Sequence, residues 1–452
     1  MVEAETLASV VRTKMKHSDP WRASAMDEEA ECLNWAAKDG LKPAGTFDAD
    51  YAALCRSFEV PAHPCLASRL PGDTPKEDAS AAVASKTSST IQLRNFAVDL
   101  TTVRLMMEAL KRSSDVDTVN FHNAGLTGAS IEVLVEGLEH TTVRCLGLDY
   151  NTPPALLLSS SPSPTRPSAS ETTEPAAAEA AETEGSLSSA RNFAGLVREG
   201  SKLKALSLRG NALEDAEAIA LAETIEENTV LSSLNLFDNK ITDAGASAFA
   251  ATLRINTVVR GLSLARNYLT PASAEAFGLL LAGGYEVLPA EQEKRAAAEV
   301  KITAQNKLAA DAMKKKKDAK VETRLPLSAV TVRTGEDGRS RAVAGGSRSL
   351  AALNLADNRE LGEDGALAGL LSRIVNARKE EAEEAGAGAG AGGGGGGGGR
   401  GGGPVWGPGA GAVVLQELHL TRCQGYAEEG GGEDDTGIAA MSFALRPTKV
   451  VV

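Results

Sequence analysis

The sequence contains few cysteines, few aromatic residues and no long apolar run. Its five cysteines are too few and too irregularly spaced for a disulfide framework. No run of about eighteen apolar residues occurs, so the sequence predicts no transmembrane helix. The first residues, with Glu3 and Glu5, do not resemble a secretory signal. These absences predict a soluble, cytoplasmic protein with no membrane partner.

Positive charge and catalytic motifs are also scarce. The net charge of −13 disfavours a general nucleic-acid binder, although a basic insert can still act locally. The sequence has no nucleophile elbow, H-E-x-x-H motif or P-loop, and its glycine tract has no flanking strand and helix. Cys55, His63 and Cys65 lie close in sequence but lack a fourth ligand and paired C-x-x-C spacing. We therefore expect no enzyme activity, small-molecule substrate, cofactor or metal.

One pattern, L-x-x-L-x-L-x-x-N-x-L, begins at Leu203, at Leu231 and, with valine first, at Val259, at intervals of 28 residues. Apolar residues two and three apart predict a short strand whose leucines face inward. The asparagine, Asn239 in the second copy, lies where the chain leaves the strand and can bond buried backbone groups. A helix with one apolar face follows, Thr242–Leu253 in the same copy. Each unit is therefore strand, turn and helix.

Weaker copies of the pattern start at Ser88, Val116, Val143, Leu350 and Leu415. Alanine or cysteine replaces the asparagine in two of them, and the sequence predicts eight strands in all. A helix over 435–445 is expected to close the array. Because a lone unit cannot bury its apolar face, units must stack. The predicted fold is an α/β leucine-rich-repeat solenoid, a ribonuclease-inhibitor-like horseshoe arc with parallel strands inside and helices outside.

Three long breaks in the repeat spacing hold polar or glycine-rich sequence, which can loop out between the strands of a solenoid. The predicted divisions are a helical N-terminal region and linker (1–87), N-terminal repeats (88–152), a disordered Ser/Pro/Glu/Ala insert (153–186), central repeats (187–283), a Lys-rich helical or disordered insert (284–347), a further repeat (348–380), a Gly-rich linker (381–412) and a C-terminal repeat (413–452).

The N-terminal region contains an amphipathic pattern. Phe47, Tyr51, Leu54 and Phe58 are spaced as one face of a helix, and a second helix-like stretch covers 28–37. Terminal repeats need covering, so we expect a cap over the first edge of the solenoid. The alternative is a docking helix for a partner.

Residues just after the last inward residue of each strand recur in register and predict a ridge at the strand exits. They are His122, Asp149, Tyr150, Arg209, Phe237, Asp238, Arg266, Asp357 and Arg422. Tyrosine, phenylalanine and arginine suit interface hot spots, and Phe237 is apolar where water is expected. We predict that Tyr150, Arg209, Phe237, Asp238 and Arg266 bind a protein partner, with Arg209, Phe237 and Arg266 as its anchors. The alternative is a set of solvated turn residues.

A basic run, Lys314, Lys315, Lys316 and Lys317, lies in the second insert. The segment from Glu291 to Arg324 contains ten lysines and arginines and six acidic residues, which gives a local charge of +4. The run predicts either a solvated, partly helical loop, contact with an acidic surface such as the tails of tubulin, or a nuclear localisation patch.

The order of these features resembles the leucine-rich repeat-containing protein 71 family of animals and protists. The resemblance covers Asp48–Cys55, the strong repeats Leu203–Leu281, the helix Tyr285–Arg295, and the later units Leu350–Asn358 and Leu415–Cys423. The poly-glycine tract and the Ser/Pro insert depart from that family. The resemblance implies a non-enzymatic scaffold associated with motile cilia and the axoneme, and no catalytic residues.

Two functions follow from these patterns. The first is a protein-interaction scaffold with axonemal or tubulin-associated partners. The alternative is a regulator of a small GTPase, because the Ran GTPase-activating protein has similar repeats. That protein carries an acidic C-terminal tail, whereas this sequence ends in 448–452, TKVVV, which disfavours the alternative.

Overall fold

The computed structural model describes residues 40–67, 69, 89–151, 192–315, 323–334, 339–389, 415–423 and 449–451. These residues form two compact units. Unit 1 consists of the described residues up to Leu196 with Gly200–Lys202 and Gly210–Ala212, and unit 2 consists of the remainder.

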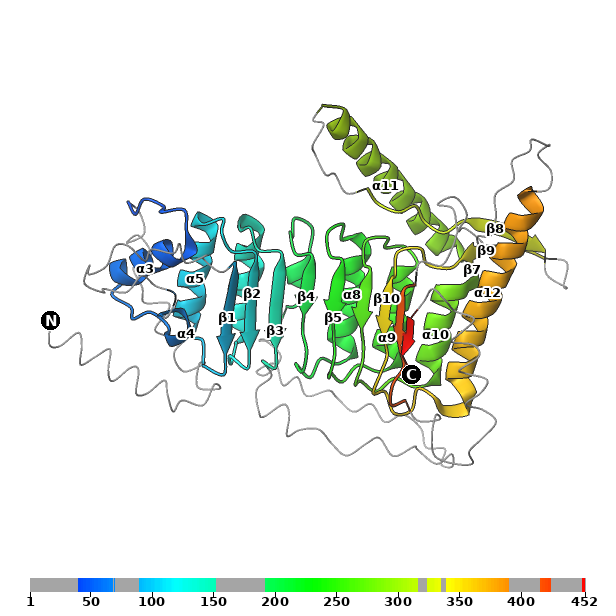
Figure 1. Cartoon of the computed structure of the whole chain (residues 1–452), viewed down its shortest axis with the longest axis horizontal. Helices are drawn as coiled ribbons and strands as arrows, with labels where there is room; N and C mark the ends of the chain where they lie inside the picture. Colours follow the sequence, from blue (N-terminus) through cyan, green and yellow to red (C-terminus); the bar gives the residue numbers. More distant parts are fainter. Residues whose placement is uncertain are drawn as a thin grey trace, which may run out of the picture. The chain divides into compact units, whose positions relative to one another are not determined.

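Unit 1 alternates helices with parallel strands (Figure 1). Its elements are α3 (Phe47–Ser57), α4 (Pro64–Ala67), β1 (Thr90–Arg94), α5 (Leu100–Arg112), β2 (Thr118–His122), α6 (Gly128–Gly137), η3 (Leu138–His140), β3 (Cys145–Asp149) and η4 (Ala194–Val197), whose last residue belongs to unit 2. β1, β2 and β3 pair in that order and in register, so Leu93, Phe121 and Leu148 form one buried row.

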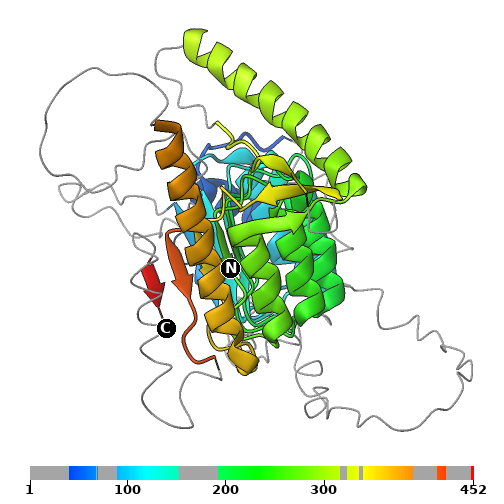
Figure 2. The same ribbon diagram turned by 90° about the vertical axis from the view of Figure 1, so that its right-hand side faces the viewer.

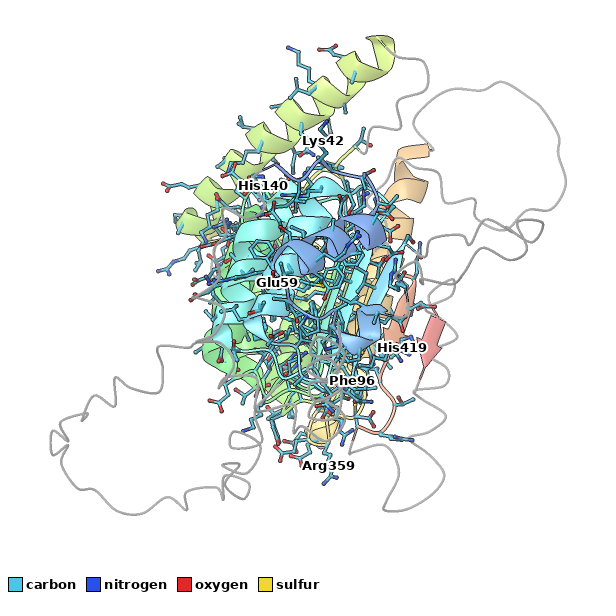
Figure 3. The ribbon with its side chains drawn as sticks, turned by 90° about the vertical axis from the view of Figure 1, so that its left-hand side faces the viewer. Lys42, Glu59, Phe96, His140, Arg359 and His419 are labelled. Atoms are coloured by element: carbon cyan, nitrogen blue, oxygen red, sulfur yellow. The ribbon has the colours of Figure 1, made fainter. Side chains whose placement is uncertain are left out.

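The N-terminal segment covers the first repeat of unit 1. α3 packs against α5, and α4 packs against β1, as expected for a cap (Figure 3). Phe47, Tyr51 and Leu54 are buried, which confirms the amphipathic pattern. The helix ends at Ser57, so Phe58 follows it and is only half-buried. The predicted helix over 28–37 lies outside the described residues.

Unit 2 continues the same alternation. Its repeat elements are β4 (Ala205–Ser207), α8 (Asp215–Glu227), β5 (Ser233–Asn235), α9 (Asp243–Leu253), β6 (Gly261–Ser263), α10 (Pro271–Ala282), β10 (Ala352–Asn354), η5 (Glu363–Gly365), α12 (Ala366–Ala389), β11 (Glu417–His419) and β12 (Lys449–Val451). The six strands pair in parallel in the order β4-β5-β6-β10-β11-β12. α8 packs against α9, α9 against α10, and α10 against α12 (Figure 2).

The core of unit 2 lies between these strands and helices. The middle leucine of each repeat pattern is buried on its strand: Leu206, Leu234, Leu262, Leu353 and Leu418. The predicted face of α9 is buried as well, through Ala246, Phe249, Ala250 and Leu253. An α/β repeat with inward leucines is therefore confirmed in each unit.

The insert between α10 and β10 is more ordered than the sequence predicts. It contains β7 (Gly283–Glu286), α11 (Pro289–Lys315), β8 (Val330–Thr334) and β9 (Ser340–Gly345). The helix expected over Tyr285–Arg295 begins only at Pro289, and Tyr285 lies in β7. β9 pairs antiparallel with both β7 and β8. Gly283, at φ +76°, permits this arrangement, because a Cβ there would lie 2.4 Å from the Gly346 nitrogen. The prediction of a helical or disordered insert missed this sheet.

Two further features correct the sequence reading. All eight predicted strands are present, as β1 to β6, β10 and β11, but β12 adds a parallel strand beyond them. β12 could not be predicted from the repeat pattern, because its sequence lacks the leucines of L-x-x-L-x-L. α12 runs to Ala389, inside the segment predicted as a linker from 381. The predicted helix over 435–445 lies outside the described residues. Within the described ranges, no helix is both long enough and apolar enough to cross a membrane.

Candidate interaction surface

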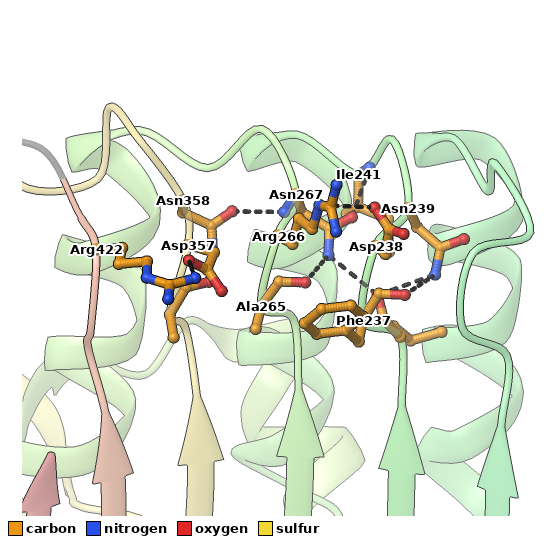
Figure 4. A network of polar contacts seen from close by, with 12 residues as sticks. Phe237, Asp238, Asn239, Ile241, Ala265, Arg266, Asn267, Asp357, Asn358 and Arg422 are labelled. Atoms are coloured by element: carbon orange, nitrogen blue, oxygen red, sulfur yellow. Dashed lines mark hydrogen bonds and ion pairs between the residues drawn. The ribbon is translucent and has the colours of Figure 1, made fainter. Parts of the chain in front are cut away.

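Asparagine side chains tie neighbouring strands together where the chain leaves each strand (Figure 4). Asn239 donates through Nδ2 to the carbonyl oxygens of Leu208 (3.0 Å) and Leu236 (2.9 Å). Its Oδ1 accepts from the backbone N–H of Leu213 (3.1 Å). All three backbone groups belong to buried residues. The predicted role of the repeat asparagine is therefore confirmed.

The same hydrogen bonds join the repeats on either side of the long insert of unit 2. Asn358 Oδ1 accepts from the Asn267 backbone N–H (2.9 Å), and Asn358 Nδ2 donates to Leu264 O (3.1 Å). Cys423, which replaces the next asparagine, donates from Sγ to Leu355 O (3.5 Å). β10 and β11 therefore repeat the local geometry of β4 to β6.

The residue preceding each repeat asparagine position has a left-handed backbone. These residues are Asn95, Asn123, Tyr150, Gly210, Asp238, Arg266, Asp357 and Arg422, with φ between 50° and 61°. Glycine, asparagine and aspartate tolerate this conformation, whereas tyrosine and arginine adopt it less readily. Because one turn geometry recurs, side chains at this position recur at the same place on successive strands.

Several of these side chains pair with a neighbour from the adjacent repeat. Arg266 Nε lies 3.1 Å from Asp238 Oδ1, and Arg422 Nη1 lies 3.5 Å from Asp357 Oδ1. The side chains of Arg266 and Arg422 are 62% and 84% exposed. Such exposed pairs contribute at most about 1 kcal/mol to stability. Their guanidinium groups remain accessible to a partner.

One residue earlier, Arg209 stacks on Phe237. The guanidinium carbon of Arg209 lies 4.7 Å from the Phe237 ring centroid. Phe237 is half-buried, and its ring lies beside Ala265, which is 1% exposed (Figure 4). Phe237 is therefore partly exposed, as its position predicts, and forms a cation–π pair with Arg209.

Tyr150 belongs to a separate cluster in unit 1. Its ring packs on Gly210, where a Cβ would lie 2.2 Å from the ring, and meets the His122 ring edge-on at 5.3 Å. Asp149 O accepts from the Asn123 backbone N–H (2.9 Å). The structure thus pairs Arg209 with Phe237, Asp238 with Arg266 and Asp357 with Arg422, while His122 and Tyr150 contact each other.

The outer face of the unit 2 strands carries small side chains, which the sequence reading did not single out. They are Ala205, Ser207, Ser233, Asn235, Gly261, Ser263, Ala352 and Asn354. The signal was available, because these residues alternate with the leucines in each pattern. Larger polar side chains follow on β11, where His419 lies 3.8 Å from Glu417. A partner can therefore approach the backbone of β4, β5, β6 and β10 closely.

The structure describes the cysteine-histidine cluster but not the side chains of the lysine run. Lys314 and Lys315 end α11, but their side chains and all of Lys316 and Lys317 lie outside the described residues. His63 is buried, and its Nε2 lies 3.1 Å from Ala97 O while its Nδ1 accepts from the Cys65 backbone N–H (3.3 Å).

Burial sets the chemistry of this cluster. It lowers the pKa of His63, raises that of Cys65, and raises that of Cys55 to about 11. Both imidazole nitrogens are already engaged by protein atoms. Among the described residues, no group of three or more His, Cys, Asp or Glu side chains could hold a metal ion.

Comparison with known proteins supports the class of repeat. The family model described as Leucine Rich repeat matches residues 227–250, from the end of α8 through β5 into α9. No curated protein matches the sequence. The match falls on the repeat whose inward leucines and asparagine bonds are described above. The chain therefore contains a leucine-rich repeat at 227–250, and such repeats are protein-binding modules that typically lack chemistry of their own.

Proposed function

We propose that this protein is a non-enzymatic scaffold that binds a protein partner through the strand exits of unit 2. The exit surface is defined here as Arg209, Phe237, Asp238 and Arg266. The observation that carries the proposal is the adjacency of two pairs on β4, β5 and β6: the Arg209–Phe237 stack and the Asp238–Arg266 ion pair. Arginine and aromatic side chains dominate binding energy at protein interfaces.

The surroundings of the exit surface favour a protein over a small molecule. The outer strand face beside it is made of small side chains, so a partner helix or loop can lie against the backbone. The asparagine bonds hold the turns rigidly, which lowers the ordering cost of binding. Under the same proposal, the strand-turn-helix repeats of each unit belong to a leucine-rich-repeat solenoid, and Tyr150 of unit 1 also binds a protein partner.

The proposed setting is the axoneme of the motile cilium, with tubulin-associated partners. The resemblance in feature order supports this setting, and the local charge of +4 around Lys314–Lys317 gives a physical reason for contact with an acidic surface. Proximity labelling in a ciliated cell, followed by stepwise salt extraction of axonemes, tests it. Release only at high salt supports the proposal, whereas detergent-soluble protein with cytosolic or nuclear neighbours contradicts it.

The exit surface is tested by a triple variant, Arg209→Ala, Phe237→Ala and Arg266→Ala, used as bait beside the wild-type chain. Partners recovered by the wild type should be lost or reduced at least about tenfold, the effect of a hot spot. The matched control is Arg260→Ala with Leu308→Ala, which truncates an exposed arginine before the start of β6 and an apolar residue on α11 that is 71% exposed. A folded triple variant that keeps every partner refutes the proposal.

A further inference from the structure

A separate pocket lies between the small antiparallel sheet of the insert and α12. Its volume is about 600 Å³. The polar side chains that line it include Ser328, Thr331, Arg333, Arg348, Arg373 and Asn376. Pockets of this size suit small ligands. No residue of the exit surface contributes to it.

Positive charge dominates the pocket lining. Three arginines line the pocket with a single acidic residue, Glu380, although the whole chain carries a net charge of −13. Arg333 and Arg348 make no ion pair with any residue that the structure describes. Arg373 Nη2 lies 3.3 Å from Glu275 Oε1, which leaves its other donors available. Among the described residues, an anionic ligand would therefore meet two guanidinium groups that make no ion pair.

The end of α10, β7 and β9 contribute small residues to this lining, while its polar side chains come largely from two elements. α12 contributes Arg373, Asn376 and Glu380 from successive turns of one face. β8 contributes Thr331 and Arg333, which alternate with the exposed Val330 and Val332 on its other face.

The insert also orients one hydroxyl of the pocket. Ser328 Oγ accepts from Arg295 Nη2 (3.1 Å), so its hydroxyl hydrogen points away from Arg295. Arg295 is held in place by a further bond to Ser328 O and is 4% exposed. The pocket therefore combines hydroxyl, amide and guanidinium donors.

We propose that this pocket binds a small phosphorylated molecule with at least two phosphate groups. Guanidinium groups donate two parallel hydrogen bonds to one phosphate, and three of them suit a ligand with more than one anionic group. The Ser328 hydroxyl and the Asn376 amide supply neutral hydrogen bonds that orient such a ligand, whereas the Thr331 hydroxyl donates to Val343 O (3.5 Å). The ligand occupies a face other than the exit surface, so it can bind together with the protein partner.

The test is calorimetry on the full chain at fixed ionic strength, with inorganic pyrophosphate, ATP and inositol 1,4,5-trisphosphate as probes. Adenosine and inositol serve as uncharged controls and should not bind. ATP binding tighter than the other two indicates a nucleotide, a preference for the inositol phosphate indicates a headgroup, and equal binding of pyrophosphate indicates a bare diphosphate. Heat from none of the three phosphates at millimolar concentration overturns the proposal.

Variants locate the binding site. Arg333→Gln with Arg348→Gln should weaken pyrophosphate binding at least about tenfold, because two charged hydrogen-bond donors are removed. Arg348→Lys should weaken it less, since charge is kept but the paired donors are lost. Arg359→Gln, an exposed arginine at the far end of β10, should bind as the wild type does (Figure 3). If the folded double variant binds unchanged, the phosphate lies elsewhere and the proposal fails.

Discussion

Asp243, the first residue of α9, hydrogen-bonds Thr270, the residue before α10 in the following repeat. Its Oδ1 accepts from the Thr270 backbone N–H (3.0 Å), and its Oδ2 accepts from the Thr270 hydroxyl. One repeat earlier, Asp215 accepts the same two hydrogen bonds from Thr242. Each aspartate is the first residue of its own helix but caps the helix that follows. α10 begins with Pro271 where α8 and α9 begin with aspartate, so it has no carboxylate at this position.

Removing this carboxylate should loosen the start of α10. Asp243 Oδ1 also accepts from the Ser273 backbone N–H (3.2 Å), so Asp243→Ala removes part of the capping of the helix and leaves the bond from the Ala272 backbone N–H to the Thr270 hydroxyl. We expect a loss of about 1–2 kcal/mol, as for other helix caps. Hydrogen exchange of the first amides of α10 and a urea transition measure it. Glu293→Ala, at an exposed position on α11, is the control, and equal exchange in the two variants contradicts the assignment.

The asparagine of the second strong repeat should be among the costliest polar residues to replace. Asn239→Ala leaves Leu208 O, Leu236 O and Leu213 N–H without their side-chain partner, at a cost of about 2 kcal/mol or more. Asn239→Cys copies the substitution that the chain itself makes at Cys423, so it should lose less. Urea unfolding ranks the two variants, and a smaller loss for alanine than for cysteine would contradict this account.

The Arg209–Phe237 stack should be measurable as a coupling energy. A cycle of Arg209→Gln, Phe237→Leu and the double variant should give about 0.5–1 kcal/mol in unfolding free energy, as for other exposed cation–π pairs. The same cycle run on partner affinity separates stability from binding. If the two substitutions add exactly in both measurements, the stack contributes to neither.

Unit 1 should lose stability as the pH falls. Burial lowers the pKa of His63 below 6.5, so the unfolded chain binds its proton more readily than the folded chain. The contribution of neutral His63 is complete above pH 6.5 and is lost as the pH falls towards the folded value.

His63→Gln should flatten this dependence between pH 7 and 5, while His140→Gln, at an exposed position, should leave it unchanged (Figure 3). Hydrogen exchange of the amides in α3 and α5 measures the stability of unit 1 alone. An unchanged slope in His63→Gln would assign the pH dependence to other groups.

The sequence alone determined the repeat. Inward leucines follow from the alternation of side chains along a strand, and the recurring asparagine follows from the need to bond buried backbone at each turn. Both rules act within a few residues, so β4, β5 and β6 and the bounds of α9 could be predicted closely. The cysteine substitute at Cys423 was predictable for the same reason.

Only the tertiary structure decided which side chains meet. The sequence placed Arg209, Phe237, Asp238 and Arg266 on one ridge, but the stacking offset between strands and the left-handed turns select the pairs that form. The sheet of β7, β9 and β8 joins segments far apart in sequence whose own patterns are weak, and the pocket arginines come from β8, the segment after β9 and α12. Local patterning fixes which face of an element is buried, whereas contacts between distant elements depend on how those faces pack.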